Sequence, residues 1–127
     1  MIIGADRTQV PLYKAAKKFG CETYAISIDG NYPGFDYADH KVIQNIKDYE
    51  AVADIAEKLE ADGALTASLD MALPAVGAAC DRRGLTGISL KSAVASTNKN
   101  KMKEALIAGG VKTAAFRRVS NRDDKCY

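Results

Sequence analysis

The first group of residues able to do chemistry is the turn Gly4-Ala5-Asp6-Arg7-Thr8-Gln9, which joins a short apolar segment to a helix-like one. Backbone N–H groups at the start of a helix attract anions. With the Arg7 guanidinium, this turn can hold a small anionic or amino substrate. The alternative is a tight turn whose charges are only solvated.

A dinucleotide-binding turn needs the pattern GxGxxG, so that the backbone can approach a pyrophosphate. Only the first glycine is present, and Asp6 at the second position would put a carboxylate beside the phosphates. NAD and FAD are therefore disfavoured. Asp29 ends the second predicted strand, where such folds bind a ribose hydroxyl. A turn-forming aspartate before Gly30 explains it at least as well.

A second polar group, Thr66-Ala67-Ser68-Leu69-Asp70, follows the fourth predicted strand. Ligands of open parallel sheets bind beside the carboxyl ends of the strands. The hydroxyl groups and the Asp70 carboxylate are therefore candidates to line the same crevice as the first turn. The alternative is that Ser68 or Asp70 only caps a helix.

Lysines 99, 101 and 103 fall on the last predicted helix, which begins after Asn98. Lys99 lies in the first turn, where a cation opposes the helix dipole. That placement is favourable where a phosphate binds and costs little where solvent screens the charge.

The sequence offers little support for a zinc site or a catalytic triad. The cysteines (Cys21, Cys80 and Cys126) lack zinc-site spacing, and they are expected to be reduced thiols. His40, the only histidine, has no evident serine, cysteine or acid partner at a helpful spacing. No metal ligand and no catalytic residue is assigned.

Composition is that of a globular protein, with 47% hydrophobic and 27% charged residues in 127. No membrane span and no signal peptide are evident, so a cytoplasmic location is expected. Residues 1–96 carry ten Lys/Arg against thirteen Asp/Glu, and residues 97–127 carry eight against three. The basic end has no interleaved aromatic residues, which disfavours nucleic acid as a partner.

Apolar runs alternate with helical periodicity along the chain. Strands are expected at 2–5, 22–28, 42–46, 63–67 and 85–89. Helices are expected at 8–19, 47–60, 70–83 and 89–94, with a last one capped by Asn98. This order predicts an α/β, Rossmann-like three-layer fold with a parallel sheet of about five strands in the order 3-2-1-4-5. The expected domains are 1–96 and, after a boundary, 97–127, which holds the linker helix.

The chain resembles the N-terminal (pre-ATP-grasp) domain of ATP-grasp ligases, and among them the carbamoyl-phosphate synthase large-chain-like members. Four motifs carry the resemblance, which covers essentially the whole chain. They are Ile-Ile-Gly-Ala-x-Arg-x-Gln-Val-Pro at the start; Ile28-Asp29 with the following Pro-Gly-Phe and Tyr-Ala-Asp; Leu65 to Asp70; and Thr97-Asn98-Lys99 with Met102-Lys103, Leu106 and Gly110-Val111.

The resemblance implies that the first turn helps form the acceptor-substrate site and that Lys99 contacts ATP. The substrate-binding candidates are Gly4, Ala5, Asp6, Arg7, Gln9 and Asp70. The family joins a carboxylate to an amine through an acylphosphate made from ATP and Mg²⁺. The expected partners are a small-molecule substrate and ATP-grasp lobes, with a homodimer possible and no membrane.

The ATP-grasp lobes, expected after Phe116, are not found in the sequence. The chain is therefore expected to be a fragment that is inactive alone and binds no cofactor, and Leu106, Ile107 and the 111–119 segment are expected to pack on the missing lobes. An alternative from another class is a free-standing Rossmann-like module that binds a nucleotide or another small molecule.

Overall fold

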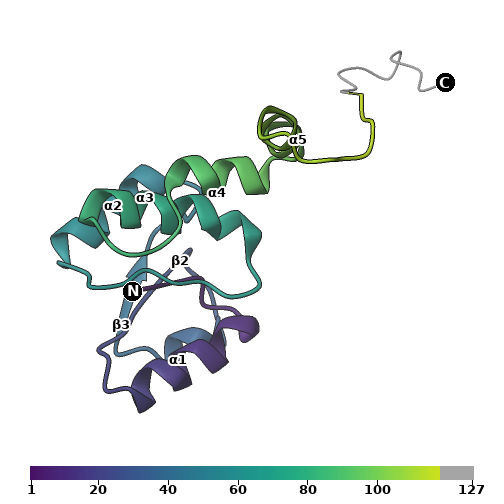
Figure 1. Cartoon of the computed structure of the whole chain (residues 1–127). Helices are drawn as coiled ribbons and strands as arrows, with labels where there is room; N and C mark the ends of the chain where they lie inside the picture. Colours follow the sequence, from purple (N-terminus) through teal and green to yellow (C-terminus); the bar gives the residue numbers. More distant parts are fainter. Residues whose placement is uncertain (118–127) are drawn as a thin grey trace.

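Side chains of the first two strands alternate between two apolar clusters, one on each face of a parallel sheet. The computed structural model describes residues 1–117. The strands are β1 (Ile2–Ile3), β2 (Tyr24–Ser27) and β3 (His40–Ile43), in the spatial order β1-β2-β3. Helix α1 (Val10–Lys18) lies on one face, and α2 (Tyr49–Lys58) and α3 (Leu73–Arg83) cover the other (Figure 1). The predicted three-layer α/β arrangement is present.

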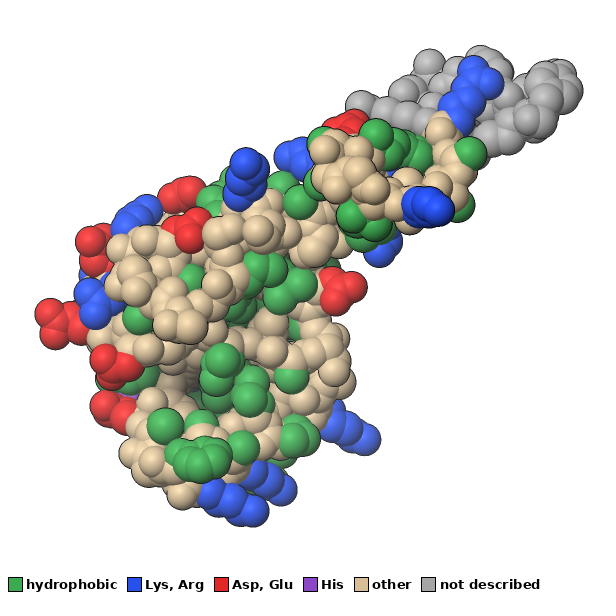
Figure 2. Space-filling view, in the orientation of Figure 1, with side chains coloured by type: hydrophobic (Ala, Val, Ile, Leu, Met, Phe, Trp, Pro, Cys, Tyr) green, Lys and Arg blue, Asp and Glu red, His purple; other side chains and the backbone are tan. Residues whose placement is uncertain are grey.

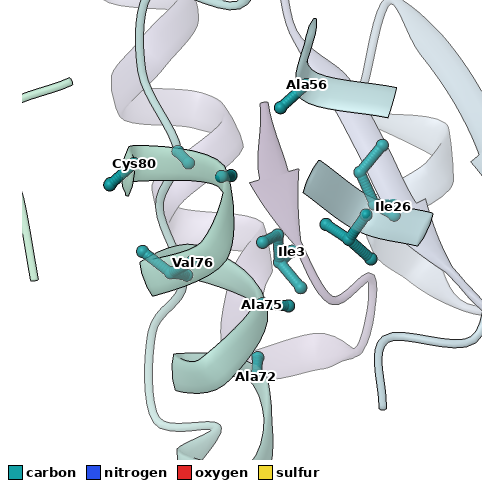
Figure 3. Close-up of a cluster of buried hydrophobic side chains, with 10 residues drawn as sticks. Ile3, Ile26, Ala56, Ala72, Ala75, Val76 and Cys80 are labelled. Atoms are coloured by element: carbon teal, nitrogen blue, oxygen red, sulfur yellow. The ribbon is translucent and has the colours of Figure 1, made fainter. Parts of the chain in front are cut away.

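The larger cluster lies between the sheet and the α2–α3 pair. Ile3 and Ile26 meet Ala56 of α2 and the small residues of α3 there, as Figure 3 shows. On the other face, Ile2 and Ala25 pack with Tyr13 of α1. Burial of this apolar surface is the main stabilising contribution.

The predicted five-stranded sheet is not found among the described residues. The fourth strand is reduced to one parallel bridge, in which the Ile3 N–H donates to Leu65 O (2.8 Å) and the Leu65 N–H donates to Met1 O (3.1 Å). A continuing ladder would bond the Ala67 N–H to Ile3 O. Instead, the Thr66 hydroxyl donates to Ile3 O (2.8 Å), and the Ala67 N–H donates to the Gln9 side chain (2.9 Å). Side chains thus end the strand after Leu65, which occupies the predicted place beside β1.

The predicted fifth strand, 85–89, is a connection between helices. Gly84 ends α3 in the left-handed conformation, and Ser89 caps α4 (Leu90–Thr97) through the Ser92 N–H. The two helices approach closely, because a Cβ on Gly77 would lie 2.8 Å from the backbone of Leu90. Residues 85–89 therefore form the turn between two packed helices.

The other boundaries differ by a few residues from those predicted. Three 3₁₀ helices precede or interrupt the predicted elements: η1 (Arg7–Gln9), η2 (Pro33–Asp36) and η3 (Asp70–Ala72). The segment 30–40, predicted as an irregular loop, contains η2. The helix predicted from Ser89 to Val94 continues to Thr97.

Helix α5 (Lys99–Ala108) stands away from the sheet and contacts α4 (Figure 1). The Asn98 side chain caps it, accepting from the N–H groups of Asn100 and Lys101 (3.1 Å each). Ile107, Val111 and Phe116 are all at least 40% exposed. Val119, in the segment expected to pack on further lobes, lies outside the described residues, and so does Cys126. No helix in residues 1–117 is long and apolar enough to span a membrane.

The start of β3 is fastened by Asp39, and this predicts a pH-dependent stability. The Thr23 hydroxyl (2.7 Å) and backbone N–H (2.8 Å) both donate to Asp39 Oδ2, and these bonds hold the pKa of Asp39 below its usual value. A lowered folded-state pKa stabilises above the unfolded pKa, near ~4, and the gain is lost as the pH falls through the folded pKa. We expect Asp39→Asn to destabilise the chain at neutral pH.

Urea unfolding measures this effect at pH 7 and in acid. The gap between Asp39→Asn and the unsubstituted chain should close as the pH falls through the lowered folded-state pKa of Asp39. Asp36→Asn, which removes another exposed aspartate, is the control. An equal gap at both pH values would contradict a role for the Asp39 charge.

Candidate functional site

A cavity of about 180 Å³ opens at the carboxyl ends of the strands. The residues that follow β1 line one side of it: Gly4, Ala5 and Asp6. The end of β2 and the turn after β3 contribute Ser27, Ile28 and 45–47, and the remaining lining residues are Tyr32, Leu69 and Met71. We call this cavity the crevice. It lies where open parallel sheets bind ligands.

Close backbone contacts shape the first turn. Gly4 has φ +104°, which favours glycine, and its carbonyl accepts from the buried Tyr13 hydroxyl (2.7 Å). Burial is the main cause that raises the pKa of Tyr13, so this hydroxyl stays protonated. The Gly34 N–H donates to Ala5 O (2.7 Å), and a Cβ on Gly34 would lie 2.6 Å from that oxygen. The turn is therefore held from α1 and from η2.

The two carboxylate oxygens of Asp6 have different roles. Oδ1 accepts from the Thr8 N–H (2.7 Å) and the Thr8 hydroxyl (2.6 Å), which caps η1. Oδ2 has no hydrogen-bond donor among residues 1–117. The side chain thus fixes the turn and still brings a negative charge to the crevice.

Gln9, predicted to bind substrate, has a different role in the structure. Its side chain is fully buried, and its amide bonds both backbone groups of Ala67: Nε2 donates to Ala67 O, and Oε1 accepts from the Ala67 N–H (2.9 Å). Gln9 therefore joins the two polar turns and does not line the crevice. Its spacing of four residues from Tyr13, on the buried side of the same helical segment, is the signal that could have shown this.

Of the other predicted site residues, three line the crevice and three lie outside it. Gly4, Ala5 and Asp6 line the crevice. Arg7 and Asp70 are exposed and do not line it, although Asp70 lies between Leu69 and Met71, which do. Lys99 is exposed at the start of α5, beyond α4 (Figure 1). Substrate binding by the first turn and by Asp70, and ATP binding by Lys99, stay predictions.

The sequence reading missed several crevice residues. They include the last residue of β2, Ser27, and three residues that follow β2 or β3, which are Tyr32, Asn45 and Lys47. Position at the carboxyl end of a predicted parallel strand was the available signal for all of them except Tyr32. Lys47 has no ion pair among the described residues.

Two other candidates are engaged elsewhere. His40 Nε2 lies 2.7 Å from Glu22 Oε1, and its ring stacks on Tyr24 with centroids 4.4 Å apart. Asp29 pairs with Lys41 (3.4 Å). His40 thus has an acid partner that its sequence spacing did not reveal, and Asp29 is a surface ion-pair residue.

Exposed side chains are distributed unevenly over the face drawn in Figure 2. Hydrophobic side chains gather in a hollow in the middle of this face, and charged side chains lie mostly around its rim. Among residues 1–117, no group of three or more His, Cys, Asp or Glu could hold a metal ion.

No protein-family model matches the chain. Its structure is similar to that of phosphoribosylglycinamide synthetase from Anaerococcus prevotii, with a TM-score of 0.84 and 34% identity over 97% of this chain. Its structural neighbours are ATP-grasp ligases, and its coverage of about a third of them is consistent with an N-terminal fragment. The expected resemblance to ATP-grasp ligases is confirmed. The closer assignment to carbamoyl-phosphate synthase large-chain-like members stays a prediction.

Two further comparisons agree. L-amino acid ligase from Bacillus licheniformis shares the fold, with a TM-score of 0.67 and 22% identity over 94% of the chain. Alanine–anticapsin ligase from Bacillus subtilis (strain 168) is 33% identical over 75 residues, which are 59% of this chain and 16% of that protein. The chain spans 32% of the Anaerococcus structure and 34% of the B. licheniformis one.

Proposed function

We propose that the chain is the substrate-side domain of an ATP-dependent carboxylate–amine ligase, and that the crevice helps bind the acceptor substrate. The observation that carries the proposal is the position of the crevice. It lies at the carboxyl ends of the strands and is lined by the first turn, in a chain that matches an ATP-grasp ligase over 97% of its length.

In such a ligase, ATP with Mg²⁺ activates a carboxylate as an acylphosphate, which an amine then attacks. The contribution of this domain is to bind and orient one reactant. Asp6 and Lys47 offer charges to the substrate, and the buried bonds of Gln9 and Gly34 hold the walls in place. Preorganised positioning of this kind lowers the entropic cost of bringing reactants together.

Among the described residues, only Lys99 is a candidate to contact ATP. Lys99 is exposed and has no ion pair among residues 1–117, so its ammonium is available to a phosphate group. The same residues do not fit Mg²⁺, because no acidic cluster among them could hold it. In this proposal the metal and most of the nucleotide are held by ATP-grasp lobes, and residues 1–127 alone do not hydrolyse ATP.

Calorimetry with Mg-ATP and a phosphate-release assay test the last point on the 127-residue chain. We expect no micromolar binding and no phosphate release. Turnover of ATP by this chain would contradict its proposed dependence on further lobes.

The coding DNA around the segment tests the ligase itself. We expect a reading frame that encodes a glycine-rich loop and acidic metal ligands downstream of Tyr127. A frame without them would favour the alternative, a free-standing small-molecule-binding module. A thermal-shift screen with nucleotides and amino acids would then identify its ligand class.

A further inference from the structure

Two residues of opposite charge, Asp6 and Lys47, line the same small crevice. They come from different strands, since Asp6 follows β1 and Lys47 follows β3. Neither has an ion-pair partner among residues 1–117. A cavity that presents two uncompensated opposite charges is complementary to a ligand that carries both.

Local hydrogen bonds order the Asp6 side chain and the Lys47 backbone. Oδ1 of Asp6 is occupied by Thr8, which leaves Oδ2 as the acceptor available to a ligand. The Lys47 N–H donates to Asn45 Oδ1 (3.0 Å), which fixes the point at which the chain leaves β3. The Asp6 carboxylate and the backbone at Lys47 are therefore both ordered within their own turns.

The remaining walls are mostly apolar. Ile28, Ile46, Leu69, Met71 and the Tyr32 ring contribute to them. Such surroundings strengthen charge–charge attraction relative to bulk water. The volume of about 180 Å³ corresponds to roughly six water molecules, at ~30 Å³ each. This room suits a compact ligand of a few heavy atoms.

We propose that the crevice binds a small zwitterionic α-amino acid, with its ammonium group at Asp6 and its carboxylate at Lys47. This inference rests on the proposed ligase function, because it names the substrate class of the same site. A phosphorylated sugar fits less well, because its phosphate would meet the Asp6 carboxylate, and Lys47 is the only cationic side chain lining the described crevice.

Amide chemical-shift titrations of the 127-residue chain test the proposal. The probes are L-alanine, ethylamine, propionate and ribose 5-phosphate. We expect L-alanine to give saturable shifts at Gly4, Asp6 and Lys47, and to bind at least tenfold more tightly than ethylamine or propionate. Asp6→Asn and Lys47→Met should each weaken L-alanine binding at least tenfold.

Matched variants separate binding from folding. The amide oxygen of Asp6→Asn can still cap η1, so this change removes the charge and keeps the turn. Asp62→Asn and Lys18→Met, which remove exposed charges that do not line the crevice, should bind L-alanine unchanged. Equal weakening by these controls would overturn the assignment of the two charges.

The remaining outcomes distinguish the two proposals. Crevice shifts with ribose 5-phosphate but not with L-alanine would overturn the substrate class and leave the acceptor site standing. If no probe shifts a crevice residue, both the amino-acid proposal and the acceptor-site role fail.

Discussion

Replacing Gln9 with leucine is expected to destabilise the chain by about 2–6 kcal/mol, from ~1–3 kcal/mol for each of the two Ala67 backbone groups that lose their partner. The side chain is fully buried, and it satisfies both the N–H and the carbonyl of Ala67. Leucine fills similar space and bonds neither group. Urea unfolding at pH 7 measures the loss.

The isosteric Gln9→Glu supplies the sharper test. Its carboxylate can still accept from the Ala67 N–H but would face the Ala67 carbonyl without a proton between them. Burial and this repulsion raise the carboxyl pKa in the folded state. A raised folded-state pKa means that the unfolded chain releases its proton first, so the destabilisation grows as the pH rises above ~4.3.

Gln9→Glu should therefore be strongly destabilised at pH 7 and partly recovered near pH 4.5, compared with the unsubstituted chain at each pH. Gln9→Leu should show no such recovery, because it has no group to titrate. Stability of Gln9→Leu within about 0.5 kcal/mol of the unsubstituted chain would contradict the bonds to Ala67.

Replacing Gly34 with alanine is expected to cost about 3 kcal/mol, at the upper end for overpacking a rigid site. The added methyl would lie 2.6 Å from Ala5 O and 2.8 Å from Ala5 Cα, and backbone atoms cannot move aside as a flexible side chain can. The change would push η2 away from the first turn and stretch the Gly34 N–H bond to Ala5. Thermal unfolding and crevice amide shifts read out both effects.

Gly63→Ala is the control, because a Cβ there would meet no atom within 4 Å. It should change stability by less than about 0.5 kcal/mol. Equal effects of the two substitutions would mean that the approach of η2 to Ala5 is not tight.

The helices were predictable because their signals are local. Pro11 near the start of α1, Gly84 after α3 and the Asn98 cap all lie where short-range preferences place them. The strand order was partly predictable, since crossover rules place β1 between β2 and the Leu65 segment. The extent of the sheet was not, because Thr66 and Gln9 replace its ladder with side-chain bonds.

The candidate site was only partly predictable for the same reason. The first turn was found from its position after a strand, and three of its residues line the crevice. Lys47 and Tyr32 come from segments whose approach to that turn depends on tertiary packing. The bonds of Gln9 to Ala67 were not predictable, because a polar residue in a turn resembles a ligand contact until its tertiary partner is known.

Beyond the one parallel bridge at Leu65, residues 66–71 of the crevice wall are not part of a β-ladder. Segments held by a few side-chain bonds open more often than segments inside a continuous ladder, and they can do so without global unfolding. The Ala67 N–H should therefore exchange with solvent faster than the Ile26 N–H, by fluctuations confined to residues 66–71. The crevice thus has a wall with its own opening equilibrium, and a ligand that seats against Leu69 and Met71 would slow that exchange.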